Sequence, residues 1–323
     1  MIHSILTVRL ITAVLFAATL VMTLTGCEAP LTMDGVERAL KEPIRRTDRF
    51  QALARRGDSV VAVGNQGVII HSPDGGASWK RVELPDWPAL IDVSACPDGS
   101  FVALAFAPLV YVSSDSGATW TPREIPSTES PQAMTCAPDN RIWVIGAFTT
   151  RWTSPDAGKT WVEKTNDEDA LLTTIQFFDE SNGVITGEFG TVMVTTDAGE
   201  TWETLAPLVD EFYPQAAYFK DPQTGWIIGL GGVVLHTNDG GNTWTEQETE
   251  TAVPLYGIEQ IGDSMVVVGG EGTVLRYDGS AWRQFDHGKP VRLYIRAIRA
   301  IDDSRAIIAG VGGTLHIIDV DGT

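Results

Sequence analysis

The chain has 323 residues, of which 43% are hydrophobic and 20% charged, a composition typical of folded globular proteins and unlike that of disordered or collagen-like chains. Its formal net charge is −19, and a chain this acidic is poorly suited to bind nucleic acid or an anionic lipid surface. We therefore exclude nucleic acid as a partner.

The first 26 residues have the layout of a secretory signal. Arg9 is the only Lys or Arg before an apolar run over residues 10–24, which leads into Thr25-Gly26-Cys27. An ordinary membrane anchor is the alternative, but the run is short for a transmembrane helix. The small residues before the cysteine resemble the bacterial lipobox, which implies that Cys27 is lipidated and becomes the mature N-terminus. We expect residues 27–35 to tether a protein that faces the periplasm. By the same resemblance, Glu28 rather than Asp after the cysteine implies the outer membrane rather than the inner one.

One motif recurs along the rest of the chain: a small hydroxyl residue, then Asp, Gly, a second small residue and Trp, which we call the Asp motif. Its tryptophans are residues 79, 120, 161, 202, 244 and 282, so the steps between them are 41, 41, 41, 42 and 38 residues. A period of about 40 residues with turn-forming residues in each unit indicates a repeat architecture.

Each repeat has the pattern of four short strands. In the fourth repeat, β-branched, aromatic and other apolar residues predominate in 171–178, 184–186 and 191–195, and a further strand begins at Trp202. Clusters of Gly, Asp and Asn separate these runs, which is the signal of consecutive hairpins. Four antiparallel strands in about 40 residues describe one blade of a β-propeller.

Six repeats that contain the tryptophan are followed by a seventh, over residues 294–323, that has only three predicted strands. The segment 36–44 precedes the first repeat and belongs to none. We therefore predict an all-β protein: a seven-bladed β-propeller over residues 36–323, closed by this N-terminal segment as the outer strand of the last blade. Closure removes the exposed sheet edge, and we expect a monomer.

The repeated motifs are better explained by structure than by catalysis. Asp can accept hydrogen bonds from its own turn, Gly takes positive φ angles, and Trp fills space between sheets. The Gly-x-x-Gly pairs, such as Gly187 and Gly190, open no helix and are therefore hairpin turns rather than phosphate loops. His71, His236 and His316 occupy equivalent positions in separate blades and cannot converge on a metal ion. We expect no catalytic residue, no metal site and no cofactor.

Two cysteines remain after Cys27, and both lie in inner segments of neighbouring repeats. An exported protein could oxidise them. Aligned on Asp98 and Asp139, however, Cys96 and Cys136 differ by one position, so their side chains should point to opposite faces of their strands. We therefore expect two buried thiols rather than a disulfide.

Basic residues concentrate near the two ends of the propeller sequence, in 38–56 and 287–305. Ring closure would bring these segments together, on a face whose other loops are acidic, with Glu124, Glu129, residues 167–169, Asp210, Glu211, Glu246, Glu248 and Glu250. Arginine can hold a carboxylate in a bidentate pair, so this basic sector suits a carboxylate-bearing peptide or protein. The alternative is that these arginines pair internally and hold the ring shut. We expect Arg296 and Arg299, three apart on an inner strand, to take opposite sides of it.

The Gly-x-x-Gly turns, the Asp motifs and the ring of seven resemble the BNR or Asp-box propellers, and most closely the photosystem II stability/assembly factor-like family, over about residues 36–323. This resemblance implies a non-enzymatic helper in the assembly of a membrane complex, with an arginine-rich patch that receives a partner polypeptide. With the lipobox, it predicts a lipid-anchored scaffold for an envelope complex, such as a transport system. The patch corresponds to Arg45, Arg46, Arg49, Arg292, Arg296 and Arg299.

A glycan binder or sialidase-like glycoside hydrolase is the alternative, because sialidases also carry Asp boxes. Sialidases are six-bladed, however, and their Arg-Ile-Pro signature is absent here.

Overall fold

The computed structural model describes residues 33–206, 208, 212–288 and 290–320. The predicted signal peptide, Cys27 and the tether up to residue 32 lie outside the described residues. The chain divides into two compact units after Glu42. In the first unit the described element is helix α2 (Asp34–Lys41), which buries none of its residues. Within the described part of the chain, no helix has the length and apolar character needed to cross a membrane.

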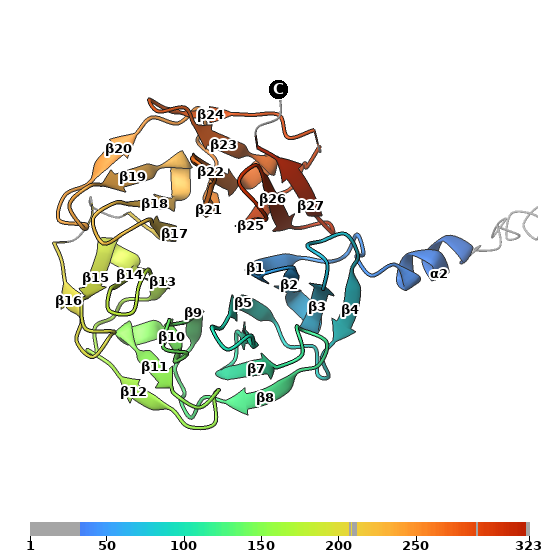
Figure 1. The fold of residues 1–323 in the computed structure, drawn as a ribbon, viewed down its shortest axis with the longest axis horizontal. Helices are drawn as coiled ribbons and strands as arrows, with labels where there is room; N and C mark the ends of the chain where they lie inside the picture. Colours follow the sequence, from blue (N-terminus) through green and yellow to red (C-terminus); the bar gives the residue numbers. More distant parts are fainter. Residues whose placement is uncertain (1–32, 207, 209–211, 289, 321–323) are drawn as a thin grey trace, which may run out of the picture. The chain divides into compact units, whose positions relative to one another are not determined.

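The second unit, Pro43–Thr323, holds seven antiparallel sheets that follow one another around a ring (Figure 1). In every sheet the strands lie side by side in chain order, because each is joined to the next by a short turn. The first strand of each blade lies nearest the centre of the ring (Figure 1).

The bounds of the first four blades are these: blade 1, β1 (Phe50–Arg56), β2 (Ser59–Gly64), β3 (Val68–Ser72) and β4 (Lys80–Glu83); blade 2, β5 (Leu90–Ala95), β6 (Phe101–Ala105), β7 (Leu109–Ser113) and β8 (Thr121–Glu124); blade 3, β9 (Pro131–Cys136), β10 (Ile142–Gly146), β11 (Arg151–Ser154) and β12 (Val162–Lys164); blade 4, β13 (Leu172–Phe177), β14 (Gly183–Gly187), β15 (Thr191–Thr195) and β16 (Glu203–Thr204).

The remaining blades follow: blade 5, β17 (Pro214–Phe219), β18 (Gly225–Gly229), β19 (Val234–Thr237) and β20 (Thr245–Gln247); blade 6, β21 (Leu255–Ile261), β22 (Ser264–Gly269), β23 (Val274–Tyr277) and β24 (Trp282–Gln284); blade 7, β25 (Ile295–Ala300), β26 (Arg305–Gly310) and β27 (Leu315–Asp319). Single 3-10 turns join the second and third strands in five blades: η1 (Asn65–Gly67), η2 (Ala147–Thr149), η3 (Glu188–Gly190), η4 (Leu230–Gly232) and η5 (Gly270–Gly272). The predicted all-β, seven-bladed propeller is therefore confirmed.

Strand direction defines two faces of the ring. Each inner strand begins at one face, which we call the top face, and the turn between the second and third strands lies there too because the strands are antiparallel. The Asp-motif turns join third and fourth strands and therefore lie at the opposite, bottom face. The core is built between neighbouring blades. For example, Ala54 and Val61 of blade 1 pack with Phe101 and Ala103 of blade 2, and Trp120 of the Asp motif covers this cluster.

The last blade differs from the prediction. Its sheet has three strands in the described residues, and the segment 36–44 that we predicted as its fourth strand instead carries helix α2, while the propeller unit begins at Pro43. The helix is favoured locally because Asp34 and Glu37 lie in its first turn and Arg38 and Lys41 in its last, which complements the helix dipole.

The ring is closed instead by packing and by a few backbone contacts. Phe50 and Leu53 of β1 pack with Ile307 and Ala309 of β26 in one core cluster. Arg49 forms an isolated bridge with Val311, and the Gly313 N–H donates to the Asp48 carbonyl over 3.0 Å.

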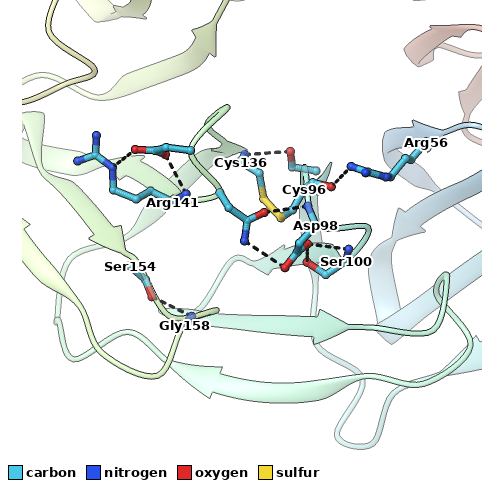
Figure 2. Close-up of a disulfide and its surroundings, with 11 residues drawn as sticks. Arg56, Cys96, Asp98, Ser100, Cys136, Arg141, Ser154 and Gly158 are labelled. Carbon is cyan, nitrogen blue, oxygen red and sulfur yellow. Dashed lines mark hydrogen bonds and ion pairs between the residues drawn. A yellow bond between two sulfur atoms is a disulfide. The ribbon is translucent and has the colours of Figure 1, made fainter. Parts of the chain in front are cut away.

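The expectation of two free thiols was wrong, because Cys96 and Cys136 form a disulfide between blades 2 and 3 (Figure 2). Their Cα atoms are 5.0 Å apart. Both belong to the core cluster between these blades. In a ring of blades, one face of a sheet packs on the opposite face of the next. A side chain on one face of a blade therefore meets side chains on the opposite face of the next blade, as Cys96 and Cys136 do.

Candidate polypeptide-binding site in the central channel

The inner strands of all seven blades surround a central channel of about 360 Å³. Its wall is polar and carries charges of both signs. Arg296, Arg299, Asp92 and Glu259 line it together with three tyrosines, Tyr213, Tyr218 and Tyr256.

A β-bulge near the start of each inner strand shapes this wall. In β25, Ile295 pairs with Gly310 and Ala297 with Ala309, so Arg296 is left over as an extra residue. The same offset occurs in all the inner strands, and the extra residues are Gln51, Ile91, Gln132, Thr173, Gln215, Tyr256 and Arg296. All of them line the channel.

The bulge corrects the prediction that Arg296 and Arg299 take opposite sides of their strand. Simple alternation would separate two residues three apart. The extra residue shifts the alternation by one, and both arginines therefore line the channel.

Arg299 is paired within the molecule. Its Nη1 lies 2.6 Å from Glu259 Oε2, and its Nε donates to the Leu53 carbonyl over 3.3 Å. The Glu259 carboxylate raises the pKa of Arg299, and burial among the inner strands opposes this effect. For this residue the internal-pairing alternative is correct.

Arg296 has no ion pair among the described residues, whose salt bridges all involve other side chains. Its Nη1 donates to Gln215 Oε1 over 3.4 Å, and its guanidinium lies 5.2 Å from the centre of the Tyr256 ring. Tyr256 in turn contacts Tyr294 edge to face, with ring centres 5.7 Å apart. Burial lowers the pKa of Arg296, although a guanidinium remains charged at any physiological pH. The hydrogen-bond and ring partners of Arg296 are neutral, and Asp92 acts on it only through its charge in the same wall. A channel cation without a direct ion pair is a suitable site for an anionic group.

Asp92 places a titratable acid in the same wall. Its two oxygens accept the N–H groups of Val93 and Met134, each over 2.8 Å, and so connect blade 2 to blade 3. Burial raises the pKa of Asp92 to about 6, against the effect of these hydrogen bonds and of Arg299 and Arg296.

The remaining arginines of the predicted patch lie at the rim of the top face. Arg45 pairs with Glu83 over 2.8 Å, whereas Arg46, Arg49 and Arg292 are exposed and their side chains have no ion pair in the described structure. Arg49 bridges to Val311, whose N–H donates to the Tyr294 carbonyl over 3.2 Å. Since Arg292 is two residues before Tyr294, Arg49 and Arg292 lie near each other, on either side of the joint between blades 7 and 1.

Sequence reasoning missed the tyrosines of this site. Tyr213, Tyr256 and Tyr294 each stand at or beside the start of an inner strand, and that shared position was the available signal. The polar bulge residue Gln215 carried no such signal, because a bulge depends on strand pairing rather than on local sequence.

No group of three or more His, Cys, Asp or Glu side chains in the described ranges is arranged to hold a metal ion. The features that do converge are arginines, tyrosines and amides. Together with the ring, they define a seven-bladed propeller with a polar, arginine-containing channel.

Comparison with known proteins agrees with this class. Residues 165–262 match the family model described as photosynthesis system II assembly factor YCF48. This match covers part of the chain and agrees with the resemblance that the repeats predicted. No curated protein matches the sequence.

Several solved structures share the fold at low sequence identity. YCF48 from Cyanidioschyzon merolae superimposes with a TM-score of 0.71 at 16% identity, over 87% of this chain and 98% of that one. A structure described as YCF48 bound to D1 peptide gives 0.69 at 18% identity, over 86% and 95%. An inactive virginiamycin B lyase from Staphylococcus aureus, with quinupristin, gives 0.73 at 13% identity, over 85% and 96%. The same fold thus serves assembly factors and enzymes.

Proposed function

We propose that this protein is a non-enzymatic binding propeller, which receives a carboxylate-bearing segment of another protein at the top mouth of its channel and acts as an assembly scaffold. The observation that carries this proposal is Arg296, a channel cation without an ion pair, beside Tyr256 and Tyr294. The similar YCF48 structure described as bound to a D1 peptide supports a polypeptide as the ligand.

The residues have distinct parts in this binding. Arg49 and Arg292 at the rim attract the acidic segment, since exposed charges act mainly on the rate of association. Arg296 then holds a carboxylate through charge-assisted hydrogen bonds, which are stronger inside the channel than in water. Tyr256 keeps the guanidinium in place and offers an aromatic surface to the peptide.

Paired peptides test the carboxylate. The protein from residue 28 onward, which contains the whole compact unit, is probed with an array of peptides made in two forms. One form carries Asp, Glu and a free C-terminus, and the other carries Asn, Gln and an amide. We expect binding of the acidic form only, and Arg296→Met to weaken it about tenfold or more, since a hydrogen bond to a charged group contributes roughly 1.5–3 kcal/mol.

Lys159→Met is the matched control, because this exposed lysine belongs to an Asp-motif turn on the bottom face. Equal binding of both peptide forms would contradict the proposed carboxylate site. An equal loss of affinity in Arg296→Met and Lys159→Met would contradict it as well. The double variant Arg49→Glu, Arg292→Glu should slow association more than Lys159→Glu, Lys220→Glu, and the difference should shrink as salt is added.

The non-enzymatic part of the proposal is supported by the separation of the arginines. Sialidase chemistry requires three arginines that converge on one carboxylate. Of the six predicted here, only Arg296 and Arg299 line the channel, and Arg299 is engaged by Glu259. Turnover of fluorogenic sialosides or glucans that disappears in Arg296→Met would overturn this part.

We also propose that the protein is attached through Cys27 to the envelope and faces the periplasm, with the outer membrane as the favoured site. The lipobox-like residues support this, and so does the Cys96–Cys136 disulfide, a bond typical of oxidising compartments. Labelled palmitate should enter the native chain and not Cys27→Ala, and membrane fractionation should find it with the outer membrane. Unlabelled native protein in the soluble fraction would contradict the anchor.

A further inference from the structure

Large apolar side chains are exposed at the top face beside Arg292, at Leu293, and in a series of five that extends from the loop between blades 1 and 2 to blade 5. The five are Trp87 (74% exposed), Phe106 (60%), Phe148 (46%), Phe189 (69%) and Leu230 (49%), and we call them the apolar arc. Isolated exposed apolar residues are common, but a series of them on one face indicates a binding surface.

Topology places the arc on one face. Phe106, Phe148, Phe189 and Leu230 occupy the turn between the second and third strands of blades 2, 3, 4 and 5. Trp87 lies in the loop between β4 and β5, next to Phe106, whose N–H donates to the Ala89 carbonyl over 2.8 Å. The turns of Phe148 and Phe189 are held in the same way against the segments that lead into their inner strands.

Three members of the arc have a strained backbone. The φ angles of Trp87, Phe148 and Phe189 are 47°, 53° and 57°, in the left-handed region that bulky residues disfavour. The equivalent residue in blade 5 is Gly231, with a φ of 68°, which shows what the turn itself requires. Gln66 and Glu271 adopt the same conformation at the equivalent positions of blades 1 and 6, so the positive φ belongs to the turn and requires no aromatic side chain. Neither burial nor the turn therefore explains why Phe148 and Phe189 are aromatic.

The charge around the arc limits what can bind there. Asp86 precedes Trp87 and Glu188 precedes Phe189. The neighbouring top-face segments that lead into β9 and β13 add the acidic residues Glu124, Glu129, Asp167, Glu168 and Asp169. Asp210 and Glu211 lie outside the described residues. An anionic lipid surface would be repelled, whereas Lys or Arg side chains beside apolar ones would be attracted.

We propose that the apolar arc is a second docking surface, for a polypeptide segment whose apolar side chains are flanked by basic residues. This goes beyond the carboxylate site, because it uses other blades and the opposite charge. Aromatic side chains at the centre of an interface commonly contribute most of its binding energy, so Phe148 and Phe189 are the expected anchors.

The test uses the protein from residue 28 onward and two fluorescein-labelled amphipathic peptides with the same Leu and Phe positions. One peptide carries Lys at its polar positions and the other carries Glu. We expect the Lys peptide to bind and the double variant Phe148→Gln, Phe189→Gln to weaken it at least about tenfold. The double variant should fold, because Gln66 already occupies the equivalent turn position in blade 1 with a φ of 62°.

Val162→Gln is the matched control, because Val162 is also exposed but lies on the outer strand β12. Arg49→Glu with Arg292→Glu should not weaken binding of the Lys peptide, which separates this surface from the carboxylate site. Unchanged binding in the Phe148, Phe189 variant would overturn the proposal, as would equal binding of the Glu peptide. If the variant loses affinity for phosphatidylglycerol–phosphatidylcholine vesicles and keeps the peptide, the occupant is a membrane and the proposal fails.

Discussion

Asp74 shows what the repeated acid does. One of its oxygens accepts the Ser78 N–H over 2.8 Å and the Ser72 hydroxyl over 2.7 Å, and the other accepts the Ser78 hydroxyl over 2.5 Å. The side-chain hydrogen bond from Ser78 is the main reason that the pKa of Asp74 falls to about 2. Asp197 and Asp239 make equivalent bonds and have the same pKa of about 2. The structural interpretation of the motif is thereby confirmed, down to the glycines at positive φ that follow each Asp.

These acids predict how stability depends on pH. Their pKa values are lower in the folded chain than the ordinary value of 3.8, so their contribution is present above about pH 4 and lost as the pH falls toward 2. Urea unfolding measured between pH 2 and 6 should show this loss. The triple variant Asp74→Asn, Asp197→Asn, Asp239→Asn should have a shallower pH dependence and a lower midpoint at pH 7. Parallel curves for the two proteins would show that the acid transition arises elsewhere.

Asp92 predicts the opposite trend, because its pKa is raised. Burial among the inner strands raises it to about 6, so ionised Asp92 opposes folding more strongly as the pH rises from about 4 to 6. In the channel its negative charge also competes with a bound carboxylate for Arg296. The affinity for the acidic peptide should therefore increase as the pH falls from 8 to 5.

Carbon-13 NMR titration of the Asp92 carboxyl checks the cause. Arg296→Met should raise the pKa of Asp92 further, since the arginine stabilises the ionised form, and Lys159→Met should leave it unchanged. A pKa near 4 in the native protein would contradict the prediction.

At the scale of elements, the sequence predicts features that depend on residues close together in the chain. It does not predict features that depend on how neighbouring strands or blades meet. The hairpin turns at Gly187 and Gly190 and the strands of each blade follow from residues close together in the chain, and they were predicted correctly. The bulge at Arg296 and the Cys96–Cys136 bond depend on how one strand or blade meets the next. The alternation of side chains along a single strand therefore predicted both the sides of Arg296 and Arg299 and the state of the two cysteines wrongly. The sequence could predict that the arginines of the basic sector lie close together, but it could not predict which of them form ion pairs. Arg45 and Arg299 meet Glu83 and Glu259 only in the folded ring.

The disulfide makes blades 2 and 3 a linked pair, and its effect can be measured. It closes a loop with a sequence separation of 40 residues, for which loop-closure entropy corresponds to about 4 kcal/mol. We expect Cys96→Ala with Cys136→Ala to lower the free energy of unfolding by roughly 2–4 kcal/mol in urea. Dithiothreitol should lower the midpoint of the native protein and leave the double variant unaffected. An equal effect of the reductant on both proteins would show that the bond does not form in solution.

At the scale of the molecule, the six tryptophan repeats and the strand pattern that follows them predicted the number of blades, but the way the ring closes could not be derived from them. The missing fourth strand of blade 7 suggested that segment 36–44 would supply it. The local charge pattern of Asp34–Lys41 favours a helix instead. The short segment 45–49 contacts blade 7 instead, through the Arg49–Val311 bridge and the hydrogen bond from Gly313 to Asp48.

Asp48 is the residue on which this closure depends. Its carboxylate is almost fully buried, accepts the Arg45 N–H over 2.7 Å, and holds Arg81 of β4 with two hydrogen bonds of 2.9 and 3.1 Å. Its carbonyl accepts the Gly313 N–H from blade 7. One residue thus connects the first blade to the last. Asp48→Ala should lower the free energy of unfolding by about 3–5 kcal/mol, because it leaves the mostly buried guanidinium of Arg81 without its main partner.

Truncated chains can distinguish the contribution of Asp48 to ring closure from any contribution of helix α2. A chain that begins at Pro43 should unfold with the same midpoint as one that begins at residue 28, because all seven blades and their core clusters lie within Pro43–Thr323. A chain that begins at Phe50 lacks Asp48 and the Arg49–Val311 bridge, and should unfold at lower urea, with early hydrogen exchange in β25–β27 and β1. If instead the chain from Pro43 is the destabilised one, then α2 contributes to closure and the predicted closing role of segment 36–44 is correct in position, although not as a strand.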